Sequence, residues 1–187
     1  MIFINKNQVD GGHLHAWCLY ETVSWKHFAY LFWSILACRL FCYKSLTTHL
    51  PLELQHNIYA ENMKTGTKLI NFGQITAAFF RVKLYWENAP LLNYGPFNLK
   101  HGQIDWRLVP QNIPLCFDVG HEMLGARSIE EAQKRIIAIF NERSSQIKHL
   151  HIHENDLIHD LHSRPDTVIT KEMIRYLTQN RTYIFEK

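Results

Sequence analysis

Short apolar runs that end in a polar side chain recur along the second half of the chain. They are VKLYWE, ending at Glu87, IPLCFD, ending at Asp118, IKHLHIH, around His151, and RTYIFE, ending at Glu186. The steps between these positions are 31, 33 and 35 residues, the length of one strand, a loop, a helix and a return loop. The pattern therefore predicts strands that alternate with helices.

Helix signals lie between these runs. Ser128 and Glu131 match a capping box, and apolar residues at helical spacing follow them, which predicts an amphipathic helix over residues 129–145. The segment TKEMIRYLTQ, residues 170–179, has the same pattern, and FGQITAAFF, residues 72–80, has it more weakly. Because strands alternate with helices, the sequence predicts an α/β protein with a parallel sheet.

The alternation within a predicted strand indicates which side chains share a face. His149, His151 and His153 are two residues apart, so they lie on one face, while Leu150 and Ile152 lie on the other. Polar groups at the carboxyl ends of parallel strands are typical of the active sites of (β/α) barrels and open α/β sheets. We therefore expect a site at these strand ends.

The longest apolar run extends from Phe28 to Tyr43 and is interrupted by Arg39. It has about sixteen residues, whereas a helix that spans a bilayer needs roughly twenty. The run therefore predicts a buried helix, and we expect no membrane association. The four cysteines form no CxxC pair and no cleavable signal precedes them, which favours reduced thiols and a cytoplasmic location.

The charge of the chain is close to balanced. Twenty Lys and Arg residues stand against seventeen Asp and Glu residues, a formal net charge of +3. Proteins that depend on phosphate contacts usually carry a larger positive charge, so the composition does not favour a nucleic-acid partner. No linker or low-complexity tract divides the chain, and we expect residues 1–187 to form a single domain.

Three motifs carry candidate ligands, and each has a structural alternative. FDVGH places Asp118 and His121 at a strand end, where both could bind one divalent cation; the alternative is a turn cap and a surface histidine. WENAP places Glu87 at the end of an apolar strand, where burial is costly unless the carboxylate is paired or bound to metal; the alternative is an exposed loop. Asp160 and His162 in DLH lie together if the segment is extended, or on a polar surface loop.

The order of these motifs resembles the xylose isomerase-like TIM-barrel superfamily. Its members include sugar phosphate isomerases and epimerases and the endonuclease IV group of abasic-site nucleases. The resemblance covers residues 80–187, through WENAP, CFDVGH, HLHIHEND, DLH and the final FE. It implies a (β/α) TIM-type barrel, but a typical barrel has about 250 residues and eight strands. We therefore expect an abridged barrel of about six strands, in which residues 1–79 form a divergent, shortened front part.

The resemblance also implies a set of site residues. Four positions match the ligands of the mononuclear sugar-epimerase site: Glu87, Asp118, His151 and Glu186. Three others match additional ligands of the multinuclear, endonuclease IV-like site: His121, Asp160 and His162. The segment TTHLPLE also resembles a family strand, which adds His49 as a candidate ligand from the preceding strand. The ion would be divalent, namely Zn, Mn, Mg or Co. The remaining histidines His13, His15, His56 and His101 are expected to be ordinary surface or packing residues.

Two departures from the superfamily pattern affect the expected activity. The loop SRPDTV lacks the glycines that follow Asp-x-His in relatives, and Leu157 stands where the epimerases carry an arginine. The resemblance implies a metal-dependent sugar or sugar phosphate isomerase or epimerase, in which Glu87 and Glu186 transfer a proton through an enediolate. The alternatives are an endonuclease IV-like phosphodiesterase and a noncatalytic barrel remnant. An exposed sheet edge would be covered by the apolar segment of residues 28–43 or by a second copy of the chain.

Overall fold

Two compact units make up the described part of the chain. The structure is a computed structural model, and it describes residues 13–16, 23–56, 63–90 and 104–186. The first unit consists of Met1–Glu87 and Asp105–Pro114, and the second consists of Asn88–Ile104 and Leu115–Lys187. The organisation as a single domain stays a prediction, and each unit is described by itself.

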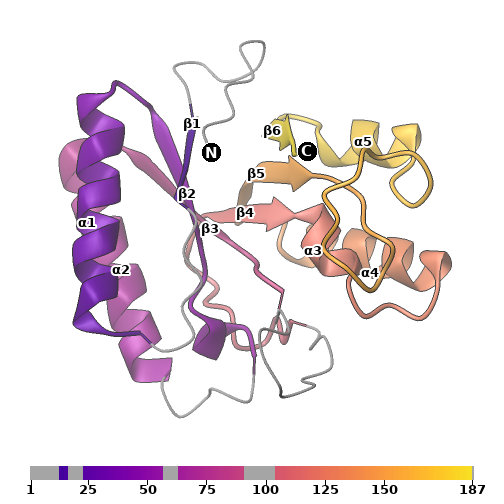
Figure 1. Cartoon of the computed structure of the whole chain (residues 1–187), viewed down its shortest axis with the longest axis horizontal. Helices are drawn as coiled ribbons and strands as arrows, with labels where there is room; N and C mark the ends of the chain where they lie inside the picture. Colours follow the sequence, from indigo (N-terminus) through magenta and orange to yellow (C-terminus); the bar gives the residue numbers. More distant parts are fainter. Residues whose placement is uncertain (1–12, 17–22, 57–62, 91–103, 187) are drawn as a thin grey trace. The chain divides into compact units, whose positions relative to one another are not determined.

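The first unit alternates strands with helices. Its elements are β1 (His13–Ala16), α1 (Trp25–Leu40), β2 (Ser45–His49), a 3-10 helix (Leu52–Leu54), α2 (Met63–Phe80) and β3 (Lys83–Glu87). Strand β2 pairs in parallel with β1 and with β3. Helices α1 and α2 lie side by side and pack against these strands (Figure 1). The predicted helix over residues 72–80 is the second half of the longer helix α2.

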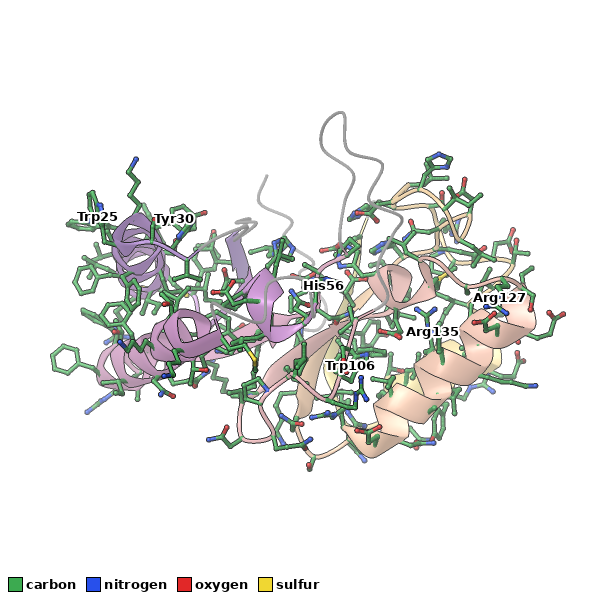
Figure 2. All side chains as sticks on the ribbon, turned by 90° about the horizontal axis from the view of Figure 1, so that it is seen from below. Trp25, Tyr30, His56, Trp106, Arg127 and Arg135 are labelled. Carbon is green, nitrogen blue, oxygen red and sulfur yellow. The ribbon has the colours of Figure 1, made fainter. Side chains whose placement is uncertain are left out.

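Helix α1 is less buried than its sequence suggested. The run from Phe28 to Tyr43 does form a helix, but the fully buried side chains of α1 are only Leu31, Ile35 and Cys38. These three positions are four and three residues apart, so they form one stripe that faces the strands. Trp25 and Tyr30 project outward from the helix and are 74% and 40% exposed (Figure 2). The prediction of a buried helix was therefore wrong for most of its surface.

Among the described residues, no helix is both long enough and apolar enough to cross a membrane. Cys38, Cys42 and Cys116 are thiols outside any disulfide, as predicted, and Cys18 lies outside the described residues.

The second unit contains the strand ends that carry the predicted site. Its elements are β4 (Leu115–Asp118), α3 (Val119–Met123), α4 (Ile129–Glu142), β5 (Ile147–Ile152), α5 (Lys171–Leu177) and β6 (Thr182–Phe185). Strand β5 pairs in parallel with β4 and with β6 (Figure 1). The two helices predicted here are confirmed, although both end earlier than expected, at Glu142 and Leu177. The described residues thus contain six strands in an α/β arrangement, as predicted.

The cap of helix α4 explains where that helix begins. The Glu131 backbone N–H donates to the Ser128 side chain over 3.2 Å, as the capping box predicts. The Glu131 carboxylate, however, accepts from the backbone N–H of Arg127, one residue before the cap. The start of α4 is therefore fixed by its own sequence.

The register of the strands aligns polar side chains in two rungs. Asp118 pairs with His151 at the strand ends, and we call this pair the end rung. Cys116 pairs with His149 two residues earlier, and Thr182 of β6 pairs with His149 from the other side. We call Cys116, His149 and Thr182 the deep rung. Paired residues of parallel strands project to the same face, so the two rungs lie one above the other.

Candidate metal centre

In the first unit, Glu87 is surrounded by histidines. Its carboxylate Oε2 lies 2.8 Å from His15 Nε2 and 3.8 Å from His49 Nε2. Glu87 is fully buried and His49 is 3% exposed. The three residues end or nearly end β1, β2 and β3, so the carboxyl ends of parallel strands bring them together, and their donor atoms are close enough to hold one ion.

His15 was expected to be an ordinary histidine, yet it belongs to this group. Strand β1 is only HLHA, which is too short and too polar to show the apolar alternation of a strand. A different signal was present, because His15 precedes His49 by 34 residues, close to the step that separates the other strand ends. Two other histidines were expected to be ordinary surface or packing residues. His56 is buried, and His101 lies outside the described residues.

In the second unit, the end rung and Glu186 form a first donor group. His151 Nδ1 lies 3.0 Å from Glu186 Oε1 and 3.8 Å from Asp118 Oδ2. Asp118 and His151 are fully buried, and Glu186 is 7% exposed. Two carboxylates and an imidazole so arranged match the donors that Zn²⁺ and similar ions use in proteins. Glu87, which the resemblance adds to this set, lies in the first unit, and its contribution stays a prediction.

A second donor group surrounds Asp160. The carboxylate oxygens of Asp160 lie 3.3 to 3.4 Å from ring nitrogens of His121, His153 and His162. The rings of His153 and His162 are stacked, with centroids 4.0 Å apart and planes within 7°. The structure thus brings together His121, Asp160 and His162, the three residues that the resemblance grouped. His153 was expected only to line the site, but it is fully buried against Asp160.

The two donor groups of the second unit are connected. His153 Nδ1 lies 3.5 Å from Asp118 Oδ2, and His162 Nδ1 lies 3.3 Å from Glu186 Oε2. Seven side chains, three carboxylates and four imidazoles, thus form a continuous cluster, which is more donors than one four-coordinate ion needs.

Asp160 and His162 influence each other's protonation. Burial alone would raise the pKa of the Asp160 carboxyl, but hydrogen bonds from His121, His153 and His162 outweigh burial and hold this pKa well below its usual range. In turn, hydrogen bonds to Asp160 and Glu186 raise the pKa of His162 to about 10, although burial alone would lower it. Without metal, Asp160 is therefore charged and His162 holds a proton at neutral pH.

Asp118 serves as both a helix cap and a site carboxylate. Its Oδ1 accepts the backbone N–H of His121 over 2.8 Å and caps α3. Its other oxygen, Oδ2, faces the rings of His151 and His153. The structural alternative for FDVGH is therefore correct for Asp118, which is a cap. It is wrong for His121, which is 7% exposed and is not a surface histidine.

Asn88 holds the end of β4 and orients His121. Its side chain donates to the Asp118 carbonyl oxygen over 2.9 Å and accepts the Asp118 backbone N–H over 2.7 Å. The backbone oxygen of Asn88 lies 2.8 Å from His121 Nδ1. Because a carbonyl oxygen only accepts, Nδ1 carries a proton. Nε2 faces Asp160 and would have to give up its hydrogen bond to that carboxylate in order to bind an ion. No motif in the sequence predicted this role for Asn88.

Asn155 shapes the loop that carries the second group. Its amide nitrogen donates to the Gly120 carbonyl oxygen over 2.9 Å, and its oxygen accepts the backbone N–H groups of Leu161 and His162. His162 has a left-handed backbone, with φ of 50°, so DLH is not extended. Asp160 and His162 are nevertheless brought together, by a turn that Asn155 stabilises.

Gly120 is required by the close approach of His153. A Cβ atom at position 120 would overlap the imidazole ring of His153. The glycine therefore leaves the space in which His153 lies between the two donor groups.

Glu154 has a structural role. Its carboxylate accepts the backbone N–H groups of four consecutive residues, numbers 166–169, at 2.9 to 3.1 Å. Burial alone would raise the pKa of Glu154, but these hydrogen bonds outweigh burial and lower it. The carboxylate thus fixes the segment that leads into α5.

A pocket of about 410 Å³ opens beside Glu186. Its lining combines two cationic side chains with apolar ones: Arg164, Pro165, Lys171, Ile174, Phe185 and Glu186. This volume is within the range of small-molecule sites. Glu186 is therefore shared by the first donor group and the pocket.

Comparison with known proteins supports the fold. No family model matches this chain, and no curated protein does. It is similar to the solved structure of the TTHB071 protein from Thermus thermophilus, soaked with ZnCl2, with a TM-score of 0.61, 13% identity and coverage of 92% of this chain and 69% of that chain. A second solved structure, of a D-tagatose 3-epimerase-like protein, matches with a TM-score of 0.60, 16% identity and coverage of 94% and 70%.

These likenesses confirm the fold predicted from the motifs. The chain has the α/β fold of these two structures, a TIM-type barrel in an abridged form, with six strands in its described residues. Its buried clusters of His, Asp and Glu could hold a metal ion.

Proposed function

We propose that this chain is a divalent-metal-dependent isomerase or epimerase of a small sugar phosphate. The observation that carries the proposal is the position of Glu186, which lies 3.0 Å from His151 in the first donor group and also lines the pocket of about 410 Å³. A carboxylate so placed can act on a substrate carbon while a neighbouring ion holds the substrate oxygens. A pocket of this volume suits a single sugar better than a polymer.

Asp118, His151 and Glu186 would hold the ion, and the resemblance adds Glu87 as a fourth ligand. A bound divalent ion supplies Lewis acidity, which makes a C–H group beside a substrate carbonyl more acidic.

Glu186 is the candidate for the residue that takes the proton. Asp118 is fully buried and already caps α3, whereas Glu186 is one of the residues that line the pocket. In the reaction, Glu186 would remove a proton from the carbon beside the carbonyl and leave an enediolate. A second carboxylate, which the resemblance identifies as Glu87, would return a proton to complete the isomerisation or epimerisation.

Arg164 and Lys171 would bind the phosphate group of the proposed substrate. Both side chains line the same pocket as Glu186. The loop SRPDTV lacks the glycines that would let backbone N–H groups approach a phosphate, and a guanidinium and an ammonium group supply the positive charge instead. Substrates without a phosphate should therefore bind more weakly.

Phosphodiester hydrolysis is the second candidate, and the second donor group favours it. His121, His153, Asp160 and His162 lie beside the first group and could hold a further ion. Two adjacent ions can stabilise both the attacking and the leaving oxygen of a phosphoryl transfer. The nearly balanced charge of the chain argues against a nucleic-acid substrate.

Proton exchange tests the proposal directly. The metal-loaded protein is incubated in D2O with a panel of aldose and ketose phosphates, and loss of the proton beside the carbonyl is followed by NMR. We expect exchange that falls by about 100-fold or more in Glu186→Gln, while the control Glu172→Gln, an exposed glutamate of α5, exchanges at the wild-type rate.

Lys171→Ala separates phosphate binding from chemistry. It should raise KM for a phosphorylated sugar and leave KM for its unphosphorylated counterpart unchanged. Absence of exchange with every sugar, together with hydrolysis of bis(p-nitrophenyl) phosphate, would overturn the proposal and support the second candidate. Absence of both activities from metal-loaded protein would support the noncatalytic remnant.

A further inference from the structure

The deep rung places a thiol and an imidazole side by side in the core of the second unit. Cys116 and His149 are paired in the strand register and are 0% and 1% exposed. Such interior positions in parallel barrels usually carry branched aliphatic side chains. A thiol and an imidazole are instead the side chains buried here, and both are metal-binding groups, while Thr182 at the edge of the rung is exposed.

Thr182 orients the ring of His149. The Thr182 hydroxyl lies 2.7 Å from His149 Nδ1 and 3.3 Å from the Lys148 carbonyl oxygen. This contact holds the ring by Nδ1 and leaves Nε2 on the opposite edge. In the tautomer in which Nδ1 donates to the hydroxyl oxygen, Nε2 bears the lone pair that binds a metal ion.

His151 completes a set of three donors. Its Nδ1 faces the carboxylates of Glu186 and Asp118, so its Nε2 lies on the opposite edge of the ring. The rings of His149 and His151 are nearly perpendicular, with centroids 5.4 Å apart. Cys116, His149 and His151 each offer a donor atom, and these atoms lie within 4.8 Å of one another. Ligand atoms around a tetrahedral zinc ion lie about 3.5 Å apart, so a small inward movement closes the set.

We propose that Cys116, His149 and His151 form a separate metal-binding site for a soft or borderline ion, such as Zn²⁺ or Cu⁺. A thiolate with two imidazoles selects such ions, whereas the carboxylates of the end rung also accept the harder Mn²⁺ and Mg²⁺. His151 contributes to both groups through opposite ring nitrogens. An ion at the deep site therefore competes with an ion at the end rung for this ring, and the site does not depend on the reaction proposed above.

Cobalt titration tests the site, because thiolate ligation gives Co²⁺ an intense near-ultraviolet charge-transfer band that oxygen and nitrogen ligands do not give. We expect this band in the wild-type protein and its loss in Cys116→Ser and in Cys116→Val, with Co²⁺ binding at the end rung retained. Cys38→Ser is the matched control. Cys38 is also a buried thiol, but its sulfur lies against the carbonyl oxygens of Tyr43 and Ser45, and burial raises its pKa to about 12.

Thr182→Val provides a test that leaves all three donors in place. It removes the hydroxyl that orients His149, and we expect the charge-transfer band to need about 10-fold more Co²⁺. A wild-type protein without the band at saturating Co²⁺, or a band of equal intensity in Cys116→Val, would overturn the proposal. The band in a protein that exchanges no sugar protons would refute only the proposed function.

Discussion

Asp118 uses its two carboxylate oxygens for different purposes. Oδ1 caps α3, and Oδ2 faces the imidazoles of His151 and His153. The two purposes can be separated, because Asn is as good a helix cap as Asp but carries no charge.

We therefore expect Asp118→Asn to lose metal affinity by about 10-fold or more with little change in the free energy of unfolding. Asp118→Ala removes the cap as well and should cost about 1 kcal/mol of stability in addition. Metal titration and urea unfolding of both variants measure these effects. Equal metal affinity in wild type and Asp118→Asn would contradict a ligand role.

The raised pKa of His162 makes the stability of the metal-free protein depend on pH. A histidine whose pKa is raised from 6.5 to about 10 on folding adds stability below pH 6.5, and this contribution is lost as the pH rises from 6.5 to about 10. The side chain is 35% exposed, so solvent screens part of the effect.

Urea unfolding of the metal-free protein across this pH range should show a decline that is smaller in His162→Gln. His159→Gln is the control, because His159 is 65% exposed and pairs with Asp156 outside the donor groups. A decline of the same size in wild type and His162→Gln would contradict the assignment.

At the scale of elements, Glu154 ties strand β5 to the start of α5. Its carboxylate accepts four consecutive backbone N–H groups, and Glu154→Gln would leave part of these donors without a charged acceptor. We expect a loss of about 1 to 3 kcal/mol and faster amide exchange over residues 166–169. Glu172→Gln on α5 should leave both unchanged. Wild-type exchange rates in Glu154→Gln would show that the carboxylate does not fix this segment.

The elements that the sequence predicted best are those whose signal is local. The cap at Ser128 defined the start of α4, and apolar runs defined β3, β4, β5 and β6, each ending near a candidate ligand. Strand β1 reads HLHA and contains no apolar run, so it gave no such signal, and His15 was missed with it. His153 was underestimated because its position depends on Gly120 and on a turn stabilised by Asn155, which are contacts between segments distant in sequence.

The exposure of α1 could not be predicted from its composition. Periodicity shows which stripe of a helix is most apolar, but α1 is apolar nearly all round, so only the packing shows which stripe is buried.

At the scale of the whole molecule, helices α1 and α2 carry an exposed apolar surface. The most exposed large side chains of these helices include Trp25, Trp33, Leu40 and Phe79, at 64% to 80%. Surfaces of this kind commonly mark interaction sites. Exposed basic side chains accompany them, Lys26, Arg39, Lys64, Lys68 and Arg81, and no acidic residue occurs within α1 or α2.

We therefore predict that the chain self-associates and that association strengthens with salt, since salt screens the repulsion between these basic residues. Sedimentation equilibrium at low and high salt measures this. A monomer under both conditions would contradict the prediction, and association that weakens with salt would indicate an ionic interface instead.

The metal content of the purified protein tests the central claim most directly. The protein is prepared without chelator and dialysed against Zn²⁺, and the bound metal per chain is then measured. The double variant Asp118→Asn with His151→Gln is treated in the same way. We predict at least one tightly bound ion in the wild type. The double variant should bind less metal than the wild type and should still unfold cooperatively. A wild type without bound metal, or a double variant that retains the full amount, would contradict the account.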